Sequence, residues 1–135
     1  MSTTQTLRGF TTISYWAADL EAAKRWYTEL LGIEPYFHRP GYYEFRIGDY
    51  QHELGILDRR FAPAGTGASP ITYWAVDDVE AAYERLLSLG AVPQAKPTEH
   101  GPGFVTASVV DPFGNTLGVM FNQHYLDILA SRVGA

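Results

Sequence analysis

The chain has 135 residues, 46% of them hydrophobic and 19% charged, a composition typical of one globular domain with its own core. Its formal charge of −5 argues against a nucleic-acid partner, and the absence of cysteine excludes disulfides and zinc–thiolate sites. The N-terminus resembles no signal peptide and no apolar run is long enough to span a membrane, so we expect a cytoplasmic protein without a membrane partner.

One sequence pattern occurs twice along the chain. Residues 13–23 read ISYWAADLEAA and residues 71–82 read ITYWAVDDVEAA, which is longer by one inserted residue, Asp78. Further on, LGIEP at 31–35 matches LGAVP at 89–93. Matched blocks in the same order indicate a duplicated supersecondary unit.

The first repeat begins with a strand rich in β-branched and aromatic residues. Asp19 then supplies an N-cap oxygen for a helix, and Gly32 is placed to end that helix in a left-handed conformation. Three further strands are expected, at about residues 33–38, 42–47 and 51–57, with Gly48-Asp49 as a turn between the last two.

The second repeat follows a joining segment at 58–70 and has the same order of elements. Asp77 with Asp78 caps its helix, and Gly90 is placed to end it. Its later strands are expected at about 92–96, 105–110 and 116–121, with a tight turn at 111–115, and a short helix at 123–133 completes the chain.

These elements predict an α+β fold of two tandem βαβββ modules, about residues 9–57 and 71–122, in a single domain of residues 1–135. A single unit leaves one sheet face uncovered. We therefore expect the two units to form one curved, barrel-like mixed sheet with the helices outside.

Alternation along the first strand of each module predicts which side chains face a pocket. If Ile13, Tyr15 and Ala17 pack on the helix, the residues between them face inward. In the second module Thr72, Trp74 and Val76 are expected to face the helix. The inward residues are then Thr12, Ser14 and Trp16 in the first module and Ile71, Tyr73 and Ala75 in the second.

Charged residues at alternate positions form a candidate site. A two-residue turn places Glu44 opposite Glu53, whereas a four-residue turn places Arg46 there, and all three share one face in either register. The cluster either binds a polar group or provides a general base, with Glu53 as the catalytic candidate, or it is a structural ion pair at a sheet edge.

The four histidines show no spacing typical of metal ligands. His52 and His124 are interpreted as surface residues. His38 ends a strand, and His100 lies in the glycine- and proline-rich stretch 97–103, so these two are candidates for a pocket rim.

The pattern DLEAAxxWYxxLLG at 19–32 and the turn DPFGN at 111–115 resemble the vicinal-oxygen-chelate superfamily, which includes glyoxalases, bleomycin-resistance proteins and extradiol dioxygenases. The resemblance covers roughly residues 9 to 122 and implies metal-ligand positions at Thr12, Glu53, Ile71 and Gly118. Only Glu53 among these binds a divalent metal well, so we expect no metal and no cofactor.

The leading hypothesis is a binding protein similar to the bleomycin-resistance branch that sequesters an organic molecule. A cationic molecule would suit the negative charges of Glu44 and Glu53. The resemblance implies a homodimer. One alternative is an enzyme of lyase, isomerase or dioxygenase type that uses Glu53 as general acid or base with His38 or His100. Another is a metal enzyme with ligands from Glu44, Glu53 and a histidine. The expected ligand-binding residues are Thr12, Ser14, Trp16, Glu44, Arg46, Tyr73, Gly118, Met120 and His100.

Overall fold

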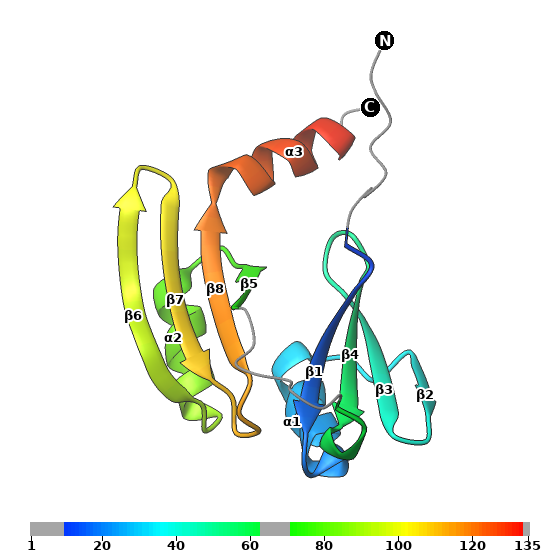
Figure 1. Cartoon of the computed structure of the whole chain (residues 1–135). Helices are drawn as coiled ribbons and strands as arrows, with labels where there is room; N and C mark the ends of the chain where they lie inside the picture. The colour runs from blue at the N-terminus through cyan, green and yellow to red at the C-terminus, as the bar shows by residue number, and fades with distance from the viewer. Residues whose placement is uncertain (1–9, 63–70, 134–135) are drawn as a thin grey trace.

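The computed structural model describes residues 10–62 and 71–133 and contains two βαβββ modules followed by a helix (Figure 1). Module 1 consists of β1 (Thr12–Ala17), α1 (Leu20–Leu31), β2 (Phe37–Arg39), β3 (Tyr42–Ile47) and β4 (His52–Asp58), and a short 3-10 helix, η1 (Arg59–Phe61), follows it. Module 2 consists of β5 (Thr72–Ala75), α2 (Val79–Ser88), β6 (Val92–Gly101), β7 (Phe104–Val110) and β8 (Thr116–Asn122), which leads into α3 (Gln123–Val133). Part of the expected joining segment, residues 63–70, lies outside the described residues.

The predicted helix starts are confirmed. The Asp19 carboxylate accepts a hydrogen bond from the Ala22 amide at 3.0 Å, and Asp78 rather than Asp77 accepts one from the Ala81 amide at 3.1 Å. Gly32 ends α1 with φ of 72°, the left-handed conformation that glycine adopts without steric cost. The two repeats therefore begin their helices by the same local chemistry.

Two strands differ in length from the prediction. β2 begins only at Phe37, although the Tyr36 amide already donates to the Glu44 carbonyl of β3 at 2.7 Å. β6 continues to Gly101 despite Pro93 and Pro97, since it is an edge strand with several register shifts, and proline is tolerated there. The stretch around His100, expected as a loop, is therefore the end of a strand and its turn.

The strands form two separate four-stranded sheets, with orders β1-β4-β3-β2 and β5-β8-β7-β6. The pairs β1–β4 and β5–β8, at one edge of each sheet, are parallel and the other pairs are antiparallel. The expected single barrel-like sheet is therefore wrong: the sheets stand side by side without closing (Figure 1). Within the described part of the chain, no helix is long and apolar enough to cross a membrane.

Asn115, in the β7–β8 turn, joins the two modules through its side chain. The Trp16 amide donates to Asn115 Oδ1 at 3.2 Å, and Asn115 Nδ2 donates to the Trp16 carbonyl at 3.0 Å. The carboxamide thus takes the place of a neighbouring strand for one residue of β1. The Asp111 carboxylate stabilises the turn by accepting a hydrogen bond from the Asn115 backbone amide. It accepts another hydrogen bond from the Tyr27 hydroxyl of α1.

The buried core is continuous across the modules. Its largest fully buried side chains include Tyr27, Phe45 and Ile56 from module 1 and Val109 from module 2. Trp26 of α1 packs against the core and donates its indole N–H to the Leu89 carbonyl at the end of α2 at 2.8 Å. The relative placement of the two sheets is therefore fixed by both apolar packing and buried hydrogen bonds.

We expect Asn115→Ala to lower the free energy of unfolding by about 3 kcal/mol, because it leaves the Trp16 amide and carbonyl without a partner and removes one of the hydrogen bonds to the Asp111 carboxylate. Urea denaturation followed by circular dichroism measures this change. Gln94→Ala is the matched control, since it removes an exposed amide that accepts a hydrogen bond from Ser108. A loss equal to that of the control would mean that Asn115 does not hold the modules together.

Candidate functional site

The same motif faces opposite directions in the two modules. Tyr15 of β1 is 3% exposed and lies in the core, whereas Tyr73 of β5 is 42% exposed. The inserted Asp78 explains the reversal, because one additional residue between strand and helix cap turns each strand side chain to the other face. Thr72 and Trp74 accordingly lie inward toward the core, and Trp74 packs against it.

A cleft of about 1160 Å³ lies between the two modules. Its walls come from β1, β3 and β4 of one sheet, from β5 and the end of β8 of the other, and from α3. Among the residues expected at the site, those that line the cleft are Thr12, Ser14, Trp16, Arg46, Glu53, Tyr73 and Met120.

Three expected site residues do not line the cleft. Gly118 is covered, since a Cβ atom there would lie 2.5 Å from Cδ1 of the Tyr73 ring. His100 lies on β6, where its Nε2 is 2.8 Å from the Thr106 hydroxyl, and it forms no rim of the cleft. Glu44 lies two residues before Arg46 along β3, on the same face of the strand but outside the cleft wall.

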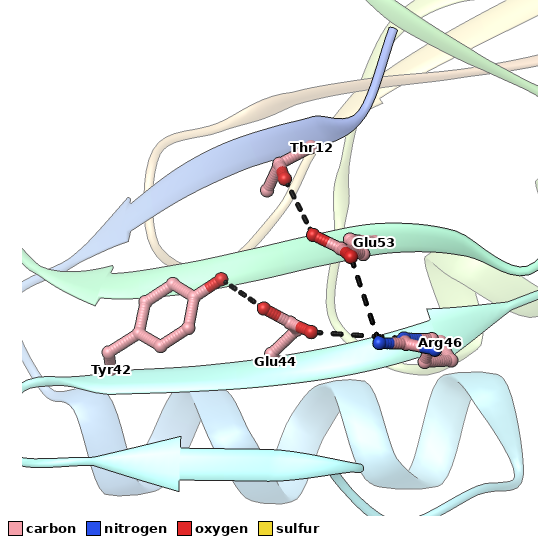
Figure 2. A network of polar contacts seen from close by, with 5 residues as sticks. All are labelled: Thr12, Tyr42, Glu44, Arg46 and Glu53. Carbon is pink, nitrogen blue, oxygen red and sulfur yellow. Dashed lines mark hydrogen bonds and ion pairs between the residues drawn. The ribbon is translucent and has the colours of Figure 1, made fainter.

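The β3–β4 turn has four residues, so the register places Arg46 opposite Glu53. The parallel pairing of β1 with β4 places Thr12 beside Glu53 on the other side. Figure 2 shows the resulting network: the Thr12 hydroxyl donates to Glu53 Oε1 at 2.8 Å, and the Tyr42 hydroxyl donates to Glu44 Oε1 at 2.8 Å. Arg46 lies between the two carboxylates.

The Arg46 guanidinium forms ion pairs with two carboxylates but lies too far from both for normal hydrogen bonds. It lies 3.8 Å from Glu53 Oε2 and 3.9 Å from Glu44 Oε2, both beyond normal hydrogen-bond distance. It stacks at 4.2 Å on the ring of Tyr36, and its buried Nε has no hydrogen-bond partner among the described residues. The cleft therefore contains an Arg46–Glu53 pair that is neutral as a whole, with polar atoms still able to bind a ligand.

Tyr42 is a persistent hydrogen-bond donor in this network. Burial, and then the hydrogen bond to Glu44, raise the pKa of Tyr42 to about 12. The phenol therefore stays protonated at neutral pH and holds Glu44 through one oxygen.

The positions at which the family resemblance implies metal ligands do not fit a divalent ion. The Thr12 hydroxyl donates to Glu53, and Ile71 has no donor atom. Counting back from the helix caps makes Ser14 equivalent to Tyr73, so Gly118 corresponds to Gly55 rather than to Glu53. Within residues 10–62 and 71–133, no group of three or more His, Asp or Glu side chains is arranged to hold a metal.

Several cleft residues were not predicted from the sequence. His52 lines the cleft and stacks on Tyr50 at 5.6 Å, although the sequence suggested only a surface position. Asp49 lines it from the β3–β4 turn, and Tyr125 lines it from α3. The alternation rule does not extend to turns or to a helix after the last strand, so it identifies neither Asp49 nor Tyr125.

Comparisons with known proteins agree with the architecture. The family model of the Glyoxalase/Bleomycin resistance protein/Dioxygenase superfamily matches residues 9–119. A glyoxalase-related enzyme from Fulvimarina pelagi has a TM-score of 0.70 at 24% identity, over 87% of this chain and 90% of that one. Lactoylglutathione lyase from Agrobacterium tumefaciens has a TM-score of 0.67 at 21% identity, over 87% and 96%. At these identities the solved structures show the fold alone, and no curated protein sequence matches the chain.

We expect Glu44→Gln to lower the pKa of Tyr42 from about 12 toward the ordinary value for tyrosine, because the negative charge beside the phenol is removed. NMR titration of protein with ¹³C-labelled tyrosine measures it, with the Tyr42 signal identified by its loss in Tyr42→Phe. Glu84→Gln, an exposed change on α2, is the control. An unchanged pKa in Glu44→Gln would show that burial alone holds the proton.

Proposed function

The chain belongs to the Glyoxalase/Bleomycin resistance protein/Dioxygenase superfamily, and we propose that it binds a neutral, planar organic molecule in the cleft between its sheets without a metal. The observation that carries the proposal is the composition of the cleft wall. Aromatic and aliphatic side chains from both modules surround the ion pair of Arg46 and Glu53, and Asp49 lines the cleft separately from the β3–β4 turn. Such a wall suits a flat apolar body with one polar end.

The polar end of the ligand is specified by the two charges together. Arg46 only donates hydrogen bonds, and ionised Glu53 only accepts them. Their nearest nitrogen and oxygen are 3.8 Å apart, so a group with adjacent acceptor and donor, such as a carboxamide, can bind both. The two glutamates alone would favour a cationic ligand, but the positive charge of Arg46 repels one. We therefore propose a neutral ligand in place of the cationic one expected from sequence.

A proton-transfer role for Glu53 on a small metabolite is the second candidate. Thr12 fixes one carboxylate oxygen, while the other has no hydrogen bond from the described residues. A positioned carboxylate of this kind is what a general base requires. Sequestration of a drug-like molecule and turnover of a metabolite share the same pocket, and the effect of Glu53→Gln on turnover separates them. The homodimer and the cytoplasmic location remain predictions.

Three probes of equal shape test the proposed ligand class: naphthamide, naphthoate and naphthamidine. We expect naphthamide to bind the wild type most tightly, because its carbonyl faces Arg46 and its amide N–H faces Glu53. Glu53→Gln removes the repulsion of an anion and is expected to improve naphthoate binding about tenfold, whereas Arg46→Met improves naphthamidine binding by a similar factor. Fluorescence titration gives the three dissociation constants for each variant.

The matched controls for these charge changes are Glu84→Gln on α2 and Arg25→Met on α1, both exposed and outside the cleft wall. If all variants bound the three probes in the wild-type order, the Arg46–Glu53 pair would not be the recognition element. If the wild type bound none of the probes, the proposed binding function would be wrong.

Metal independence has a separate test. We expect chelator-treated protein to bind naphthamide with unchanged affinity, since no described donor set fits a divalent ion. Equilibrium dialysis against zinc, nickel and manganese is expected to show less than stoichiometric uptake. Stoichiometric uptake that is lost in Glu53→Gln would contradict the metal-free reading and favour a metal enzyme with other ligands.

A further inference from the structure

α3 crosses from module 2 to module 1 beside the cleft (Figure 1). It continues directly from β8, and the Asn122 side chain caps it by accepting from the His124 amide at 2.9 Å. The Gln123 amide is bound by the Gly103 carbonyl of the β6–β7 turn at 3.1 Å. The first turn of α3 is therefore fixed to module 2.

Among residues 10–62, α3 contacts module 1 at the β3–β4 turn. The Tyr125 hydroxyl donates to Asp49 Oδ2 at 3.0 Å, and the ring of Tyr125 meets that of Tyr50 edge-on at 5.5 Å. Near the other end of the helix, the Arg132 guanidinium lies 4.8 Å from the centre of the Tyr50 ring. Asp49 is exposed, so water competes for its hydrogen bond.

Two of the contacts between the modules, that at Asn115 and that at Tyr125, differ in strength. The contact at Asn115 is buried and contains several hydrogen bonds between the β7–β8 turn and β1. The corresponding turn of module 1 contacts α3 through Tyr125 instead. A second cavity of about 130 Å³ lies beside Tyr125 and is lined by Asp49 and residues 75–77, so this end is loosely packed. Tyr125 lines both the cleft and this cavity.

We propose that α3 is a strap across this side of the cleft, latched by Tyr125 and Asp49, and that its release controls how fast a ligand enters and leaves. The proposal rests on the proposed binding function. The helix is fixed at its first turn by Asn122 and Gly103, so release of the latch swings its far end away from module 1 while the two sheets stay joined at Asn115. The strap thereby sets the residence time of the ligand rather than its affinity.

A distance measurement between spin labels tests the strap without any ligand. The chain has no cysteine, so Glu34→Cys in module 1 and Ala130→Cys on α3 provide two unique exposed labelling sites. We expect one dominant distance between the labels in the parent protein, with a small population at a longer distance. In Tyr125→Phe that population is expected to be about fivefold larger, as the loss of one hydrogen bond predicts. Tyr43→Phe is the matched control, because Tyr43 donates a similar bond to Glu21 away from α3.

Stopped-flow kinetics with naphthamide test the effect on ligand exchange. We expect Tyr125→Phe to raise the association and dissociation rate constants by the same factor of about five, with the dissociation constant nearly unchanged. A larger dissociation constant with an unchanged association rate constant would show that Tyr125 is only part of the cleft wall. An unchanged distribution of spin-label distances would exclude the latch. Absence of naphthamide binding to the wild type would overturn the proposed function, while the label distances would still decide whether the latch exists.

Discussion

The carboxamide of Asn115 stands where a neighbouring strand would otherwise hydrogen-bond to β1, and the arrangement of the two modules depends on it. It satisfies both backbone groups of Trp16 and is itself held by the buried Asp111 carboxylate. The two sheets do not pair with each other, and further contacts between the modules, such as the Trp74 indole N–H with the Tyr15 hydroxyl at 3.3 Å, lie in or beside the shared core. The space between the two sheets is the cleft, and Trp16 lies both at the Asn115 junction and in the cleft wall.

The duplication and the faces of the strands could be predicted because they depend on local chemistry. Counting residues back from Asp19 and Asp78 is sufficient to orient β1 and β5, including the reversal between Tyr15 and Tyr73. The position of Arg46 opposite Glu53 could only be stated as one of two registers, since both turn lengths keep the same face. The single barrel-like sheet was predicted wrongly, because the pattern within each strand does not reveal whether the two modules pair with each other.

The charge of the whole chain is a poor guide to the charge of the cleft. The net charge of −5 and the two glutamates suggested a cationic ligand. Arg46, however, lies between Glu44 and Glu53, and its positive charge balances the negative charge of Glu53, the glutamate that lines the cleft. In each module an aromatic ring also covers a glycine, Tyr42 over Gly55 and Tyr73 over Gly118. The duplicated scaffold is thus kept while the cleft wall presents aromatic rings and the Arg46–Glu53 ion pair.

The central claim is that a neutral aromatic molecule binds between the sheets with its polar group at Arg46 and Glu53. A two-dimensional amide NMR spectrum recorded during titration with naphthamide tests this most directly. The account predicts the largest shifts at residues 12–16, at Arg46 and Glu53 and at residues 72–75, with little change along the outer faces of α1 and α2. Shifts confined to those helices, or to the exposed strand β6, would contradict it.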